Sequence, residues 1–183
     1  MIDFLSLDEY LSLNIALNNY NSLFHIISLI LAQVFDFMTI FFFFLILAFF
    51  TKKRKHTMFL IILTTSTAIG YILKLIVQRS RPYFFGITNY ANSLGYSFPS
   101  GHSIVAFALA FYYAKDKSVQ AKLNFYGLAM LVALSRVVLG VHYLSDVIAG
   151  ACISMFIVSL YFWKEKEINK EINKFLKIMI KRI

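Results

Sequence analysis

Long apolar segments separated by short polar ones dominate this chain. Residues 23–50 are apolar over a length of 28 positions, interrupted by His25, Gln33 and Asp36. A helix rises 1.5 Å per residue, so this segment would measure about 42 Å, whereas a hydrocarbon core is about 30 Å thick. We therefore expect the segment to begin in the membrane interface, to tilt, or to break near Asp36.

Four further apolar segments are predicted to be helices. Residues 57–77, 123–139 and 142–163 have roughly the length of a membrane span, about 20 residues. Residues 103–114 are short, and form a span only if the helix starts at Pro99 inside a cavity lined by protein. The pattern predicts an all-α fold, a polytopic transmembrane helix bundle of about five spans, with six as the alternative.

Amphipathic helices are predicted at both ends of the bundle. Ser6 and Glu9 fit a capping box, and we expect residues 1–22 to hold an amphipathic helix in the membrane interface. After Trp163, apolar residues at helical spacing alternate with lysines. Residues 164–183 are therefore predicted to form a basic amphipathic tail on the cytoplasmic leaflet, with a solvated or oligomer-packing helix as the alternative.

The composition agrees with a single membrane-embedded domain over residues 1–183. Of these residues, 60% are hydrophobic, and the mean hydropathy of +0.71 excludes an ordinary soluble protein. The first residues are acidic and lack a basic n-region, so we do not expect a cleavable signal peptide. The single cysteine, Cys152, cannot form an internal disulfide and is expected to be a small packing residue.

The positive charge is unevenly distributed. A net charge of +9 could suggest a nucleic-acid partner, but 14 of the 18 Lys and Arg lie in two short loops and the C-terminal tail. Short basic segments beside apolar spans follow the positive-inside rule, so these loops are predicted to face the cytoplasm, and no nucleic acid is expected. Five spans would then place the N-terminus outside and the C-terminus inside.

The four remaining basic residues are Lys74, Arg79, Arg81 and Arg136. In the predicted topology Lys74, Arg81 and Arg136 reach the outer face from different elements. Cations at membrane depth are costly, and three together would form an anion site suited to a phosphate or diphosphate. Snorkelling of each cation to the interface is the alternative, and it is all that we expect of Arg79.

A short segment with the sequence PSGH, at residues 99–102, is predicted to start a helix at the same face. Ser100 is a good N-cap residue, and Gly101 permits a close approach of the backbone. The N-terminus of a helix presents free N–H groups and a positive dipole end, which together bind phosphate.

Two histidines and a carboxylate supply candidate chemistry. His142 and Asp146 are spaced i, i+4, so on a helix they would meet. The carboxylate would orient the imidazole and leave its far nitrogen free as a nucleophile. His102 could then protonate the departing oxygen as a general acid.

The same residues allow two other interpretations. A non-catalytic transporter of anions or lipids would need the basic cluster but not the pair of His142 and Asp146. A metal site could use His102, His142 and Asp146 as ligands, but three adjacent cations would repel a divalent ion. No metal and no cofactor are therefore expected.

In order, spacing and residue type, these residues resemble the three-part signature of the type-2 phosphatidic acid phosphatase superfamily. The matching parts are Lys74-x6-Arg81-Pro82, Pro99-Ser100-Gly101-His102, and Ser135-Arg136-x5-His142-x3-Asp146. No signature position departs from the pattern, and the flanking spans resemble the membrane-embedded lipid phosphatase branch.

The resemblance implies a metal-independent phosphatase that acts through a phosphohistidine. His142 would be the nucleophile, Asp146 its orienting partner and His102 the general acid. The phosphate would be held by Lys74, Arg81, Ser100, Gly101 and Arg136.

The implied substrate is a phosphorylated lipid at the outer face of a bacterial cytoplasmic membrane. Bacterial members suggest a lipid A 1-phosphatase, a phosphatidylglycerophosphate phosphatase or an undecaprenyl diphosphate phosphatase. The loop at residues 83–98 is too short to form a large lid, which favours lipid A or broad specificity.

Overall fold

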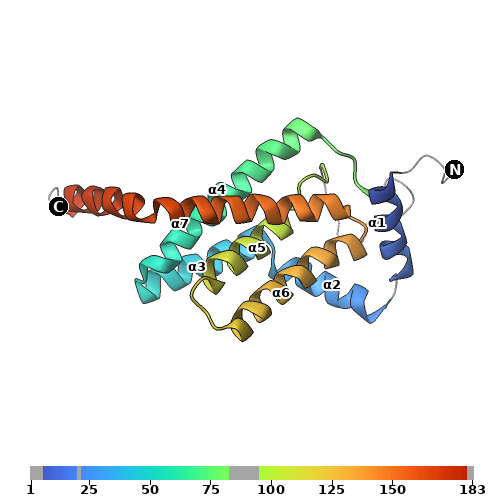
Figure 1. Ribbon diagram of the computed structural model, residues 1–183, viewed down its shortest axis with the longest axis horizontal. Coiled ribbons are helices and arrows are strands. Elements are labelled where there is room, and N and C mark those ends of the chain that lie inside the picture. Colours follow the sequence, from blue (N-terminus) through green and yellow to red (C-terminus); the bar gives the residue numbers. More distant parts are fainter. Residues whose placement is uncertain (1–5, 20–21, 83–94, 181–183) are drawn as a thin grey trace.

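The computed structural model describes residues 6–19, 22–82 and 95–180, with the backbone alone for residues 169 and 171–180. All regular secondary structure in this part of the chain is helical (Figure 1). The helices are α1 (Leu7–Asn18), α2 (Leu23–Val34), α3 (Phe37–Thr51), α4 (Arg54–Val77), α5 (Gly101–Ala114), α6 (Val119–Val138) and α7 (Leu144–Ile180). Most of the predicted loop at residues 83–98 lies outside the described residues.

The long apolar segment at residues 23–50 breaks at Asp36, which was one of three predicted possibilities. Phe35 ends α2, and the Asp36 carboxylate accepts a hydrogen bond of 2.9 Å from the N–H of Met38 to start α3. An Asp in this position satisfies one of the free N–H groups at a helix start. The break leaves helices of 12 and 15 residues, each shorter than a full span of about 20 residues.

Three helices are long and apolar enough to cross a membrane: α4, α6 and α7 up to Ile168. The number becomes four if α1 and α2 are counted as one broken span. The sequence predicts about five, and the difference lies in α3 and α5, which are apolar but have only 15 and 14 residues. The all-α transmembrane bundle is confirmed.

The central helix of the bundle is α5, which packs against α4, α6 and α7 (Figure 1). Its Ala106, Ala108 and Ala110 are buried, and small residues of this kind let helix backbones approach closely. The hydroxyl of Ser154 on α7 donates a hydrogen bond of 2.7 Å to the carbonyl of Ile104 on α5. The helix that begins with the PSGH segment is therefore held on three sides.

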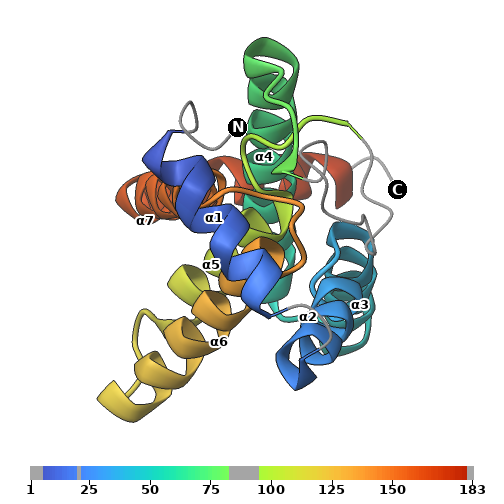
Figure 2. The same ribbon diagram turned by 90° about the vertical axis from the view of Figure 1, so that its right-hand side faces the viewer.

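Helix α1 lies across one end of the bundle, against α6 and α7 (Figure 2). The predicted capping box is present, since the N–H of Ser6 donates to Glu9 at 2.8 Å and the N–H of Glu9 donates to Ser6 at 3.3 Å. The helix buries Ser12 and Ala16 and exposes Leu7, Leu11 and Leu17. Its tightest packing against the bundle is therefore through small residues, and three of its four leucines face outward.

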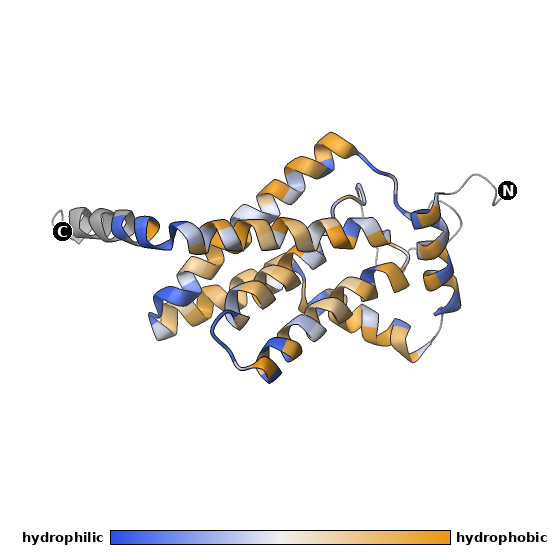
Figure 3. Cartoon of the chain, in the orientation of Figure 1, coloured by the Kyte–Doolittle hydropathy of each residue, from blue (hydrophilic) through white to orange (hydrophobic). Residues whose placement is uncertain are grey.

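The predicted tail helix is continuous with the last span. Helix α7 runs for 37 residues from Leu144 to Ile180 and extends beyond the bundle, where its hydropathy changes from apolar to polar (Figure 3). The prediction that Cys152 is a small packing residue is wrong, because its side chain is exposed. It shares this outward face of α7 with Ile148 and Phe156, at intervals of four residues.

Helix α7 and the start of α5 touch at Gly150, which yields a first test. A Cβ atom at Gly150 would lie 2.7 Å from the carbonyl oxygen of Ser100 and 2.8 Å from Cβ of Ser103. We expect Gly150→Ala to destabilise the protein by about 1–3 kcal/mol, because a backbone atom must move. Gly127→Ala, where a Cβ meets nothing within 4 Å, is the matched control. Equal melting temperatures for the two variants in detergent would contradict this close contact.

Candidate active site

A pocket of about 180 Å³ lies where α4 and α6 end and α5 begins. It is lined by Asp36, Phe37, Lys74, Arg81, Gly101, His102, Arg136 and His142. Six of these eight residues were predicted site residues, and they come from all three parts of the signature. The fold therefore brings together signature residues that are far apart in the sequence, since 68 positions separate Lys74 from His142.

His142 and Asp146 meet, but not on one helix as predicted. Helix α7 begins at Leu144, so His142 lies in the turn before it. One oxygen of the Asp146 carboxylate accepts a hydrogen bond of 2.9 Å from the N–H of Tyr143 and lies 3.5 Å from Nδ1 of His142. The latter distance is long for a hydrogen bond, which is common for catalytic pairs without substrate. Asp146 thus caps the helix start and lies behind the imidazole.

The imidazole of His142 is buried and surrounded by cations. Its Nε2 lies 3.5 Å from Nη1 of Arg81. Burial, followed by the positive charges of Arg81, Arg136 and Lys74, holds the pKa of His142 well below its usual value. The ring is therefore neutral at neutral pH and keeps an unshared electron pair, as a nucleophile requires.

Lys74 braces the segment that leads into α5. Its ammonium donates to the carbonyls of Tyr96 at 2.9 Å, Ser97 at 3.3 Å and Pro99 at 2.8 Å. An ammonium has three donors, so direct contact with a phosphate requires one of these bonds to be exchanged. Lys74 therefore places a positive charge in the pocket and also fixes the backbone segment that precedes Gly101.

The two predicted arginines differ in their surroundings. Arg81 donates from Nε to the carbonyl of Gly95 at 2.8 Å and from Nη1 to the carbonyl of Val141 at 2.9 Å. It therefore joins the segment before α5 to the turn that carries His142. Arg136 reaches the pocket from the end of α6 and is only 2% exposed.

Some residues of the PSGH segment support the start of α5, and others line the pocket. Ser100 is fully buried and does not line the pocket; its hydroxyl caps α5 by accepting from the N–H of Ser103 at 3.5 Å. Gly101 and His102 do line it. Nε2 of His102 lies 2.9 Å from the carbonyl of Ala32 on α2, and because a carbonyl only accepts, the proton is assigned to that nitrogen.

Asp36 and Phe37 line the pocket but were not among the predicted site residues. The sequence did single out Asp36 as an interruption in an apolar segment, and a carboxylate at such a depth is itself a signal of function. The carboxylate of Asp36 caps α3 and also places a negative charge in the same pocket as Arg136 and His102.

The prediction that Arg79 snorkels is wrong. Its Nη1 donates to Asp146 at 2.9 Å and to Ser145 at 2.6 Å, and its Nη2 donates to Asp8 at 2.9 Å. The guanidinium also lies over the ring of Tyr143, 3.8 Å from its centre. Arg79 therefore holds the carboxylate behind His142 and joins it to α1.

Helix α1 also caps α7. The N–H of Ser145 donates to Asp8 at 3.1 Å, the hydroxyl of Ser145 donates to the same carboxylate, and the N–H of Leu144 donates to Ser12 at 2.9 Å. The first N–H groups of a helix have no partner within it. Asp8 and Ser12 satisfy two of them in α7, so the N-terminal helix supports the turn that carries His142.

The metal-site alternative requires a cluster of at least three ligands. Among the residues that the structure describes, no three His, Cys, Asp or Glu side chains are grouped so that they could hold a metal ion. His102, His142 and Asp146 therefore do not form the set that this interpretation requires.

Residues 55–170, more than half of the chain, match the family model described as the PAP2 superfamily. The chain belongs to the PAP2 superfamily. The resemblance seen in the signature residues is thereby confirmed.

Curated relatives of this PAP2 protein carry the names of lipid phosphatases. It is 38% identical over 85 residues to phosphatidylglycerophosphatase B of Haemophilus influenzae, covering 42% of this chain and 35% of that protein. It is 31% identical over 121 residues to phosphatidylglycerophosphatase B of Bacillus subtilis, covering 61% and 56%. It is 36% identical over 98 residues to lipid A 1-phosphatase of Rhizobium johnstonii, covering 46% and 37%. The matches thus span between about a third and just over half of these relatives.

Two crystal structures share the fold. Aquifex aeolicus LpxE aligns with a TM-score of 0.76 at 24% identity, covering 88% of this chain and 98% of that one. The PAP2-type phosphatidylglycerolphosphate phosphatase of Bacillus subtilis aligns with a TM-score of 0.73 at 22% identity, covering 88% and 85%. At these identities the likeness establishes the membrane-embedded helical architecture.

The contacts of Arg79 predict a measurable coupling. Arg79→Gln should lower the free energy of unfolding by about 2–3 kcal/mol, because it leaves the fully buried Asp146 carboxylate without a charged partner. Asp8→Asn should cost about 1 kcal/mol alone and less in the Arg79→Gln background, since the shared partner is gone. The four proteins of this double-mutant cycle are compared by denaturation in detergent. Additive effects would contradict a joint network.

Proposed function

We propose that this PAP2 protein hydrolyses a phosphomonoester or diphosphate on the headgroup of a membrane lipid through a phosphohistidine intermediate. The observation that carries this proposal is the placement of His142. Its ring is buried beside Arg81, has Asp146 behind it, and lines a pocket that also contains Lys74 and Arg136. A neutral imidazole among cations suits attack on a phosphate.

The first step transfers the phosphoryl group to the enzyme. Nδ1 of His142 faces Asp146, so Nε2 is the nitrogen that attacks phosphorus while the bond to the lipid oxygen breaks. The imidazole becomes a positively charged phosphohistidine, which the Asp146 carboxylate stabilises. Binding of the anionic substrate favours the protonated form of His102, which gives its proton to the departing oxygen.

The second step restores the enzyme. A water molecule attacks the phosphohistidine and gives a proton to the now neutral His102. The bond between phosphorus and Nε2 breaks, inorganic phosphate leaves, and His142 is neutral again. The guanidinium groups of Arg81 and Arg136 and the charge of Lys74 stabilise the phosphoryl group in both steps, and this electrostatic contribution dominates such transfers.

The pocket lies at the end of the bundle opposite the basic loops, so the positive-inside rule assigns it to the outer face of a bacterial cytoplasmic membrane. The lipid tails would stay in the bilayer while the phosphate enters between the helix ends. The 1-phosphate of lipid A is our first candidate substrate. Phosphatidylglycerophosphate is the second, supported by the names of two relatives, and undecaprenyl diphosphate is the third.

A non-catalytic transporter of anionic lipids is the competing function. It would use the same cations, but it has no need for a neutral histidine backed by a buried carboxylate. Turnover therefore separates the two functions.

The test is phosphate release from the three candidate lipids by purified protein in excess EDTA. We expect release from at least one lipid, and His142→Ala should lower it at least about a thousandfold because the nucleophile is lost. His56→Ala, at the far end of α4, is the control histidine variant and should keep its turnover. Loss of activity on chelation that zinc restores would contradict the metal-free reaction, and turnover in His142→Ala would contradict the assigned nucleophile.

A further inference from the structure

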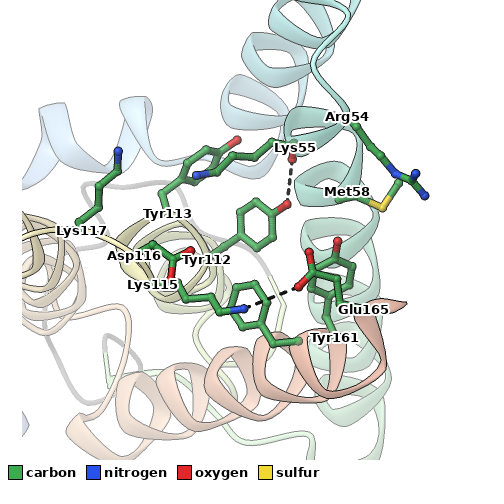
Figure 4. Close-up of a pocket in the computed structure, with 11 residues that line it drawn as sticks. Arg54, Lys55, Met58, Tyr112, Tyr113, Lys115, Asp116, Lys117, Tyr161 and Glu165 are labelled. Atoms are coloured by element: carbon green, nitrogen blue, oxygen red, sulfur yellow. Dashed lines mark hydrogen bonds and ion pairs between the residues drawn. The ribbon is translucent and has the colours of Figure 1, made fainter. Parts of the chain in front are cut away.

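A second and larger pocket lies at the opposite end of the bundle. It has a volume of about 340 Å³ and is formed where α4 begins, where α5 ends and along α7 (Figure 4). Its Arg54 precedes Lys74 of the candidate active site by 20 residues on α4, which corresponds to about 30 Å along a helix. This is the thickness of a hydrocarbon core, so the two pockets face opposite sides of the membrane.

Charged side chains from three segments line this second pocket, which we call the basic pocket. The four basic ones are Arg54, Lys55, Lys115 and Lys117, and the two acidic ones are Asp116 and Glu165, which gives a net charge of +2. The ammonium of Lys115 lies 3.6 Å from the carboxylate of Glu165, and these two charges balance each other. The remaining charged side chains of the lining are Arg54, Lys55 and Lys117, which are basic, and Asp116, which is acidic.

Tyrosines at the end of α5 fix Lys55 in place. The hydroxyl of Tyr112 donates a hydrogen bond of 3.1 Å to the backbone carbonyl of Lys55. The ammonium of Lys55 lies 4.7 Å from the centre of the Tyr113 ring, within reach of a cation–π contact. Both the backbone and the side chain of this exposed lysine thus contact another helix.

Exposed aromatic side chains mark the level of this pocket in the membrane. Trp163 on α7 is 78% exposed and lies in the chain between Phe162 and Glu165, which both line the pocket. Phe49 and Phe50, at the end of α3 just before the basic loop, are also exposed. Large aromatic side chains next to basic residues are typical of the interface between hydrocarbon and water. The pocket therefore lies at the level of the lipid headgroups.

We propose that the basic pocket binds the phosphodiester headgroup of an anionic phospholipid in the leaflet opposite the candidate active site. Lys55, at the start of α4, and Lys117, in the turn after α5, supply charge-assisted hydrogen bonds to the phosphate oxygens. The rings of Tyr112 and Tyr161 supply apolar walls for the glycerol and the first carbons of the chains. The net charge of +2 favours a headgroup with net negative charge over a zwitterionic one.

A lipid in this position would contact α4, α5 and α7 together. A ligand that binds only the folded state stabilises it by mass action, so the lipid would hold these three helices against one another. The proposal does not depend on the phosphatase reaction, because the two pockets share no residue.

The test compares two double variants of the full chain in detergent. Lys55→Gln with Lys117→Gln removes two charges from the pocket, and Lys52→Gln with Lys53→Gln removes two exposed charges from the same end that do not line it. Binding of phosphatidylglycerol, phosphatidylcholine and inorganic phosphate is measured by native mass spectrometry, after equal melting temperatures in lipid-free detergent show that both variants are folded.

We expect the pocket variant to bind phosphatidylglycerol about tenfold more weakly than the unchanged chain, and the control variant to differ less than twofold. An equal loss in both variants would overturn the proposal, because it would show general surface electrostatics. Equal binding of phosphatidylcholine would overturn the preference for an anionic lipid. Inorganic phosphate binding as tightly as the lipid would show a site for free anions instead.

Discussion

The candidate active site of this molecule depends on the buried carboxylate of Asp146. It is fully buried, accepts from the N–H of Tyr143 and from Arg79, and lies behind His142. The backbone carbonyl of the same residue accepts a hydrogen bond of 3.0 Å from the N–H of Ser100. A buried charge is costly unless it is paired and hydrogen-bonded. Its partners come from separate segments of the chain, so the hydrogen bonds and ion pair of this carboxylate bring those segments together at the site.

Two kinds of interaction hold the bundle together, one in its middle and one at the end that carries the candidate active site. In the middle, small residues such as Ala108 and Ala110 let α5 contact its neighbours, which is the usual way in which helices associate in lipid. At the catalytic end, helix starts are satisfied by polar side chains, as Asp8 and Ser12 do for α7. Close packing thus fixes the scaffold, while hydrogen bonds to helix ends fix the direction of the site residues.

Local patterns predicted much of this arrangement and long-range contacts set the remainder. The capping box at Ser6 follows from neighbouring residues alone, so the sequence was sufficient to predict it. The break at Asp36 was one of three possibilities that the apolar pattern left open. The signature predicted that Lys74, Arg81, Arg136, His102 and His142 would meet, because its spacing is specific. The roles of Arg79 and Asp8 were missed because they depend on partners 67 and 137 positions away. The exposure of Cys152 depends on which face of α7 turns outward, which local composition did not indicate.

We propose above all that His142 carries the phosphoryl group. The most direct test incubates the protein with a lipid labelled in its phosphate, stops the reaction within milliseconds, and maps the label by mass spectrometry. We expect a phosphorylated protein whose label lies on His142, is stable in base and is lost in acid. The label should be absent from His142→Ala. A label on a serine or on another histidine would contradict it.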